Sequence, residues 1–127
     1  MARILVVDDD PAIRQLLADL LEMEGYEVSQ AVDGLAAVRA VKASSPDFVV
    51  LDVMMPGLDG YEVLSTIRAQ KGEPVPVLML TAGAEPDSDA RAWAHGVDFY
   101  LAKPFTPDAV LDLIDSALTH QVKTDEL

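Results

Sequence analysis

The stretch PDFVVLD, residues 46–52, decides the fold. Its apolar residues occupy both faces of a predicted strand, so we expect other elements to cover that strand on both sides. The strand ends at a single carboxylate, Asp52, and the residues that follow include Pro56 and Gly57, which favour a turn. The sequence therefore predicts a core strand that stops at a lone acid, and the partner of that acid across the fold has to be found.

Predicted strands and helices alternate on both sides of this stretch. Short apolar runs predict strands at residues 3–7, 26–31, 46–52, 75–81 and 99–103. Helices are predicted between them: from Pro11 to Gly25, from Asp33-Gly34 past Val41, over 61–69, over 87–95, and from Thr106-Pro107 past Leu118. This alternation predicts an α/β protein of the (βα)5 type, a doubly wound parallel five-stranded sheet with helices on both faces.

Three of these helices carry detailed signals. Asp10 before Pro11 predicts an N-cap followed by a first-turn proline, and Gly25 predicts the end of the same helix. Apolar residues support these helices: Ile13, Leu16, Leu17, Leu20 and Leu21 follow helical spacing in the first, the second carries Leu35, Val38 and Val41, and the last has Val110, Leu111, Ile114, Ala117 and Leu118 on one face.

Length and charge limit the possible functions. The 127 residues suffice for one domain, expected at 1–120, with 121–127 as a tail or the start of a linker. No run approaches the roughly 20 apolar residues of a membrane span. The N-terminus lacks a signal-peptide core and the chain has no cysteine, so a cytoplasmic protein is expected. A net charge of −13 disfavours nucleic acid and anionic lipid as ligands.

The ends of the predicted strands carry the polar chemistry. The first strand ends in Asp8-Asp9-Asp10, the third in Asp52, the fourth in Thr81 and the fifth in Lys103. In a parallel sheet of this kind, ligands bind beyond the carboxyl ends of the strands. If the first and third strands are neighbours, several carboxylates converge, and a hard cation such as Mg²⁺ relieves their repulsion. A metal, a lysine and a hydroxyl around one nucleophilic carboxylate suit phosphoryl transfer.

Each of these signals also has a structural interpretation. A run of three aspartates is most often a solvated turn or a helix cap, and Asp10 is interpreted as the cap; Asp52 alone is compatible with a turn. Trp93 is expected to cover the core, and neither His95 nor His120 is assigned a ligand role. The coincidence of polar residues at four strand ends is what favours a functional site.

The chain resembles the receiver domain of bacterial two-component response regulators over nearly its whole length. The stretches that carry the resemblance are ILVVDDDPAIRQLL, PDFVVLDVMMPGLDGYEVL, VPVLMLTA and GVDFYLAKPF, in order and with the family's spacing. The resemblance implies a flavodoxin-like sheet with strand order 2-1-3-4-5. It also implies a phosphorylation switch, in which a phosphohistidine of a histidine kinase or phosphotransfer protein gives its phosphoryl group to Asp52 in the presence of Mg²⁺.

Individual roles follow from the same resemblance. It implies that Asp9, Asp52 and the backbone carbonyl of Met54 bind Mg²⁺ directly, and that Asp8 acts either as a ligand or through one. Mn²⁺ can substitute for Mg²⁺. Lys103 and Thr81 are expected to contact the phosphoryl oxygens, and Tyr100 to change rotamer with Thr81. The bond before Pro104 is expected to be cis. The face of the fourth helix, fifth strand and fifth helix is expected to contact an output protein or output domain.

Two alternatives and one departure from the family pattern remain. The first alternative is a pseudo-receiver, an interaction scaffold that is not phosphorylated. The second is a Mg²⁺-dependent aspartyl phosphatase, an enzyme class that usually has a second acid at the position held here by Met54. We therefore expect no enzyme activity beyond self-catalysed phosphoryl acceptance and loss. The last helix, PDAVLDLIDSALTH, has no Lys or Arg, in contrast to receivers that form a charged dimer face. The protein is expected to be a monomer or a phosphorylation-dependent homodimer.

Overall fold

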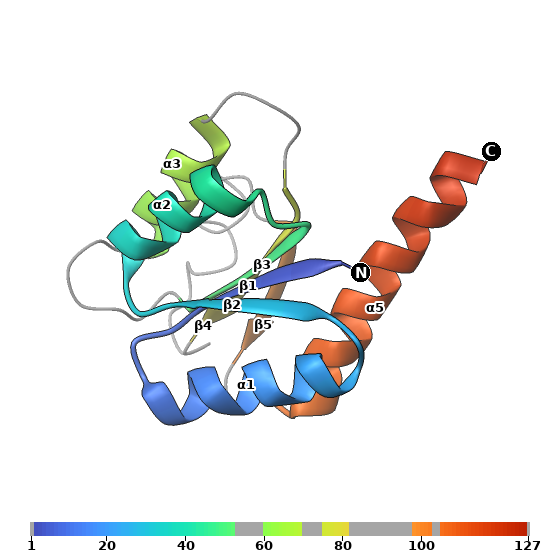
Figure 1. Ribbon diagram of the computed structural model, residues 1–127, viewed down its shortest axis with the longest axis horizontal. Helices are drawn as coiled ribbons and strands as arrows, with labels where there is room; N and C mark the ends of the chain where they lie inside the picture. Colours follow the sequence, from blue (N-terminus) through green and yellow to red (C-terminus); the bar gives the residue numbers. More distant parts are fainter. Residues whose placement is uncertain (1, 53–59, 70–74, 82–97, 103–104, 127) are drawn as a thin grey trace.

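A computed structural model of the protein describes residues 2–52, 60–69, 75–81, 98–102 and 105–126 (Figure 1). The elements are β1 (Arg3–Val7), α1 (Pro11–Met23), β2 (Glu27–Ala31), α2 (Gly34–Ser44), β3 (Phe48–Asp52), α3 (Gly60–Ala69), β4 (Val77–Thr81), β5 (Phe99–Ala102) and α5 (Pro107–Glu126). The predicted strands all exist, although three of them begin one or two residues later than predicted. The predicted helix over 87–95 lies outside the described residues.

All five strands are parallel and form one sheet in the order β2-β1-β3-β4-β5. The predicted fold class and strand order are therefore confirmed. β3 is the central strand, and each of its five residues is buried. Its apolar residues pack on both sides of the sheet, as the sequence of this strand predicted.

Two layers of helices cover the sheet (Figure 1). α1 and α5 lie on one face, where Ile4, Val6, Phe48 and Val50 contribute to a core with residues of both helices. α2 and α3 lie on the opposite face over Leu5, Val7, Val49, Leu51 and Met79. Successive residues of a strand point to opposite faces, so each strand supplies both cores.

The ends of α1 follow the predicted capping signals. The Asp10 side chain accepts hydrogen bonds from the amides of Ala12 (2.9 Å) and Ile13 (3.5 Å), and Pro11 is the first helical residue. Gly25, just past the end of the helix, has a φ of +95°. That φ lies in the region that glycine adopts without a Cβ clash, so the sequence correctly predicted where the helix ends.

Two apolar residues of the helical patterns are exposed. Leu16 is 50% exposed and Leu35 is 53% exposed, although both belong to apolar helical patterns. At 100° per residue, Leu16 lies roughly 150° around α1 from the mean direction of the buried Leu17, Ala18 and Leu21. Leu35 is similarly rotated away from the buried side of α2. Small residues such as Ala18 fill the inward positions instead.

α5 is the longest helix and continues beyond the sheet (Figure 1). Its predicted core side is confirmed: Val110 and Ile114 are buried, and Leu111, Ala117 and Leu118 pack against the same core. Residues 121–126 are helical, and the domain boundary at residue 120 and the assignment of 121–127 as a tail or the start of a linker stay predictions. Among the described residues, no helix is long and apolar enough to cross a membrane.

Candidate functional site

The register of β1 against β3 determines which acids meet. Val7 pairs with Leu51, so Asp8 and Asp52 lie at neighbouring positions one residue further along the two strands. Asp52 is the last residue of β3, and Asp8 follows the last residue of β1. Both strands end at the same edge of the sheet because they are parallel. The neighbouring strands on which the predicted site depended are therefore present.

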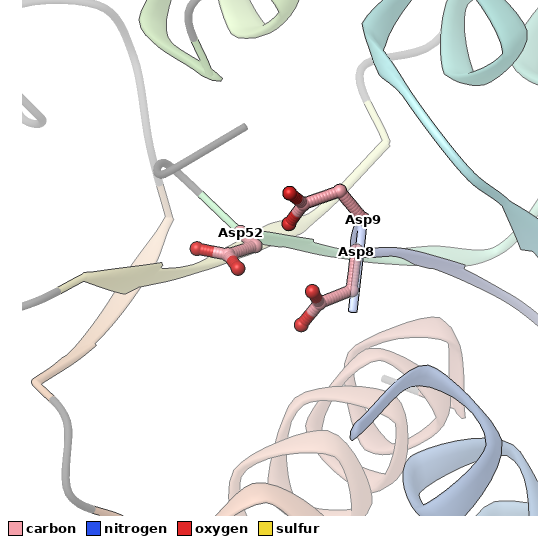
Figure 2. A group of neighbouring side chains, drawn as sticks. All are labelled: Asp8, Asp9 and Asp52. Atoms are coloured by element: carbon pink, nitrogen blue, oxygen red, sulfur yellow. The ribbon is translucent and has the colours of Figure 1, made fainter. Parts of the chain in front are cut away.

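Asp8 and Asp52 are almost completely buried, with 1% and 2% of their surfaces exposed. Asp9 is exposed. The three carboxylates approach so closely that one oxygen from each lies within 4.8 Å of the others, and their side chains extend toward a common region (Figure 2). We call Asp8, Asp9 and Asp52 the acidic cluster. It has a buried side formed by two acids and an open side at Asp9.

The electrostatics of the acidic cluster favour a bound cation. Two unit charges about 5 Å apart repel by roughly 3 kcal/mol at an effective dielectric constant of about 20. The donor set consists of carboxylate oxygens alone, which Mg²⁺ and Ca²⁺ prefer over softer ligands. Mg²⁺ is usually held by one or two carboxylates and retains several waters, and the exposed side at Asp9 leaves room for water. The residues present therefore fit a magnesium site.

Asp10 does not belong to the acidic cluster. Its side chain turns to the first amides of α1, while its own backbone amide donates to Oδ1 of Asp8 at 2.9 Å. Thus three consecutive aspartates have three different environments: Asp8 is buried, Asp9 is exposed beside the cluster, and Asp10 caps the helix. The interpretation of Asp10 as the cap is confirmed.

The remaining predicted site residues are described in part. The backbone of Thr81 ends β4, next to the strand that ends in Asp52, and its register partner is Ala102 of β5. Tyr100 is partly buried in β5 and packs against the core under α2 and α3. Lys103, Pro104 and Met54 lie outside the described residues, so their predicted roles stay predictions. Trp93 and His95 also lie outside the described residues.

One residue beside the acidic cluster was missed by the sequence analysis. Nη1 of Arg14 donates to the backbone carbonyl of Asp8 at 2.9 Å, and Nε of Arg14 donates to Oε1 of Gln30 at 3.0 Å. The available signal was that Arg14 is the one basic residue in α1, one turn after the cap at Asp10. That signal is weak, because an arginine on a helix is usually a solvated surface residue.

Comparison with known proteins identifies relatives over most of the chain. The family model of the response regulator receiver domain matches residues 4–115. The DNA-binding dual master transcriptional regulator RpaA of Synechocystis sp. is 40% identical over 119 residues, which are 93% of this chain and 49% of RpaA. The chain thus spans about half the length of the curated relatives it matches.

Solved structures agree with the fold. A CheY-like response regulator receiver domain protein from Methanospirillum hungatei matches with a TM-score of 0.88 and 30% identity, over 98% of both chains. The response regulator protein TrrA from Thermotoga maritima, solved in complex with Mg²⁺ and BeF, matches with a TM-score of 0.81 and 40% identity, over 91% of this chain and 98% of TrrA.

Proposed function

This chain belongs to the response regulator receiver domain family, and on that premise we propose that Asp52 is its phosphoacceptor. Receiver domains of two-component response regulators are switched by phosphorylation on an aspartate. The observation that carries the assignment to Asp52 is its place at the end of the central strand, buried beside Asp8 and within the acidic cluster. Asp9 and Asp10 are less suitable as phosphoacceptors, because Asp9 is exposed beside the cluster and Asp10 caps α1.

The proposed reaction is transfer of a phosphoryl group from the phosphohistidine of a histidine kinase or phosphotransfer protein. A carboxylate oxygen of Asp52 forms the new bond to phosphorus while the bond from phosphorus to the imidazole nitrogen breaks, and the imidazole leaves with that electron pair. Asp8 and Asp9, with Asp52, would hold Mg²⁺, which would neutralise charge on the transferring oxygens. Asp8 and Asp9 remain carboxylates throughout.

We assign supporting roles to residues of the neighbouring strand ends. The Met54 carbonyl would complete the protein ligands of the ion, and Lys103 and Thr81 would contact the phosphoryl oxygens once the group is on Asp52. Tyr100 would change rotamer with Thr81, and the bond before Pro104 would be cis. The family resemblance supports these roles, as does the order of the strands, because β4 and β5 follow β3 at the same edge of the sheet.

The output of this switch is proposed to be a protein contact. The proposed face is that of β5, α5 and the helix predicted over residues 87–95, which lie outside the described residues, and an output protein or another domain of a longer protein would bind it. The net charge of −13 argues against direct DNA binding by these 127 residues. RpaA is named as DNA-binding, and this chain covers only 49% of it. The argument from net charge therefore applies to these 127 residues alone and not to other segments of a longer protein.

No separate substrate is turned over in this proposal: the chain catalyses only its own phosphorylation and dephosphorylation. The composition supports a cytoplasmic place of action. A pseudo-receiver is disfavoured by the complete acidic cluster. An aspartyl phosphatase is disfavoured because Met54 occupies the position where such enzymes usually carry a second acid.

Phosphorylation with a small donor tests the proposal. Acetyl phosphate with Mg²⁺ should add one phosphoryl group to the wild-type chain by intact mass, and Asp52→Asn should abolish the addition. Asp112→Asn is the matched control, because Asp112 is an exposed acid of α5. Full labelling of the Asp52→Asn variant would disprove the assignment, and turnover of excess acetyl phosphate at an enzyme-like rate would favour the phosphatase.

A further inference from the structure

The guanidinium group of Arg14 bridges two strands at the acidic cluster. Its Nη1 donates to the carbonyl oxygen of Asp8 at 2.9 Å, and its Nε donates to Oε1 of Gln30 at 3.0 Å. The backbone amide of Arg14 donates to the carbonyl of Asp10 at 3.0 Å, so the residue sits in the first turn of α1. One side chain of α1 therefore connects the end of β1 with β2.

The carbonyl that Arg14 holds belongs to the peptide unit between Asp8 and Asp9. A peptide unit is planar, so fixing its oxygen also fixes the orientation of the Asp9 amide and the direction in which the chain enters Asp9. The backbone amide of Asp8 is held as well, by the carbonyl of Ala31 at 3.2 Å. Arg14 thus holds the peptide from which two of the three acids of the cluster extend.

The other end of the bridge is a residue of a strand that is paired in the sheet. Gln30 lies in β2 and is the register partner of Val6 in β1. The planar guanidinium group presents its donors in a fixed arrangement, so two simultaneous hydrogen bonds determine its orientation. A lysine at this position would supply the charge but not the same pair of donors.

We propose that Arg14 is a positioning residue of the acidic cluster, which holds the Asp8–Asp9 peptide in the conformation that binds Mg²⁺. Arg14 contacts neither the ion nor the phosphoryl group in this proposal; it acts through the backbone. The inference rests on the magnesium site of the proposed function. It goes beyond that function by assigning a task to a residue of α1 and to its anchor, Gln30.

The direction in which Mg²⁺ affinity changes when Arg14 is removed distinguishes a positioning role from a purely electrostatic one. Arg14 carries a positive charge close to a cation site, so its removal should by Coulomb's law alone tighten Mg²⁺ binding. Loss of positioning should instead weaken binding, because the carboxylates then have to be ordered when the ion binds. The two effects oppose one another, and we expect the second to dominate in Arg14→Ala.

Mg²⁺ titration of the full chain, by calorimetry and by amide NMR shifts of Asp9, provides the test. Arg14→Ala should weaken binding about 3- to 10-fold, at or below the loss typical when a partner of a metal ligand is removed. Arg14→Lys should recover only part of the affinity. Gln30→Ala, which changes no charge on an exposed position of β2, should weaken binding about 2-fold. Arg39→Ala is the control that removes the same charge from an exposed position of α2.

A double variant completes the experiment. Because Gln30 acts through Arg14, Arg14→Ala with Gln30→Ala should bind Mg²⁺ no more weakly than Arg14→Ala alone. Unchanged or tighter binding in Arg14→Ala would overturn the inference and leave the magnesium site intact, as would full additivity in the double variant. If Arg14→Ala fails to fold, the Mg²⁺ affinity of Gln30→Ala decides. Unchanged or tighter binding in Gln30→Ala would then overturn the inference. Failure of the wild-type chain to bind Mg²⁺ would overturn both this inference and the proposed function.

Discussion

Four aspartates near one sheet edge differ in role because their surroundings differ. Asp8 and Asp52 are buried, Asp9 is exposed, and the side chain of Asp10 accepts hydrogen bonds from the first amides of α1. A carboxylate engaged as an N-cap uses its oxygen to accept from the first amides of the helix. The proline after Asp10 already indicated its capping role in the sequence, whereas the burial of Asp8 beside the exposed Asp9 is a result of the packed structure.

The difference between Asp9 and Asp10 predicts opposite consequences of two substitutions. Asp9→Asn should weaken Mg²⁺ binding by 10-fold or more, on the order expected for loss of a charged ligand. Asp10→Ala should leave the affinity within about 2-fold of wild type but lower the free energy of unfolding by about 1 kcal/mol through loss of the cap. Calorimetric Mg²⁺ titration and urea unfolding measure the two quantities. Equal losses of affinity in both variants would contradict this division of roles.

The central strand shows why the packing of the elements determines stability. Phe48 begins β3, is completely buried, and stacks on Phe99 of β5 with ring centroids 6.0 Å apart. It belongs to the core between the sheet and the helices α1 and α5. Leu35, in contrast, is an equally apolar residue of α2 whose side chain is 53% exposed.

This contrast predicts two very different losses of stability. Phe48→Ala should lower the free energy of unfolding by about 3–5 kcal/mol, because it removes buried area and leaves a cavity. Leu35→Ala should change it by less than about 0.5 kcal/mol, because little buried area is lost. Urea unfolding followed by circular dichroism measures both. A loss above 2 kcal/mol in Leu35→Ala would show that α2 packs differently from the structure.

A hydrogen bond joins the α1–β2 junction to α5. The hydroxyl of Tyr26 donates to Oδ1 of Asp115. Burial is the main cause that raises the pKa of Tyr26, followed by the hydrogen bond to Asp115 and by the negative charges of Asp115 and Glu24. Ionisation of the Tyr26 phenol would place a second negative charge beside the Asp115 carboxylate and would break the bond.

The raised pKa of Tyr26 predicts loss of stability in alkaline solution. The folded state retains the phenol proton at pH values where the unfolded tyrosine, with a pKa of about 10, has released it. The stabilisation is thus complete below about pH 10 and is lost as pH rises toward the folded-state pKa. Tyr26→Phe should remove the contribution of this phenol to the fall in unfolding free energy above about pH 10. Asp115→Asn should only reduce that contribution. An unchanged slope in Tyr26→Phe would contradict the prediction.

The whole molecule carries a net charge of −13, which acts against compactness through self-repulsion. Added salt screens this repulsion without regard to site, whereas an ion held by the acidic cluster stabilises only the folded state. The two contributions can be separated because screening depends on ionic strength and site binding depends on the ion.

Mg²⁺ should therefore raise the melting temperature more than NaCl at the same ionic strength. At a concentration 100 times its dissociation constant, a ligand of the folded state adds about 2.7 kcal/mol to the unfolding free energy. Asp9→Asn should remove most of the additional Mg²⁺ effect and keep the NaCl effect, as calorimetric scans in the two salts would show. Equal effects of the two salts on the wild-type chain would argue against a specific ion site.

The sequence by itself determined the alternation of strands and helices, the fold class, and the positions of the acids at the strand ends. These features are local: a short apolar run, a cap and a glycine each act within a few residues. The capping role of Asp10 and the end of α1 at Gly25 were predicted correctly for this reason. Leu16 and Leu35 follow the apolar spacing but are exposed, because a periodic pattern does not show which side of a wide apolar stripe faces the sheet.

The tertiary structure decided which strand ends meet. The order of the sheet places β1 beside β3, and this pairing brings Asp8 against Asp52, far away in the chain. The strand order was expected from family resemblance, since a parallel strand carries no local mark of its neighbour. The bridge from Arg14 to Asp8 and Gln30 was not predicted at all, because it requires α1, β1 and β2 to be packed together. Long-range pairing is fixed by burying both faces of the sheet at once, which is a property of the packed molecule and not of any single segment.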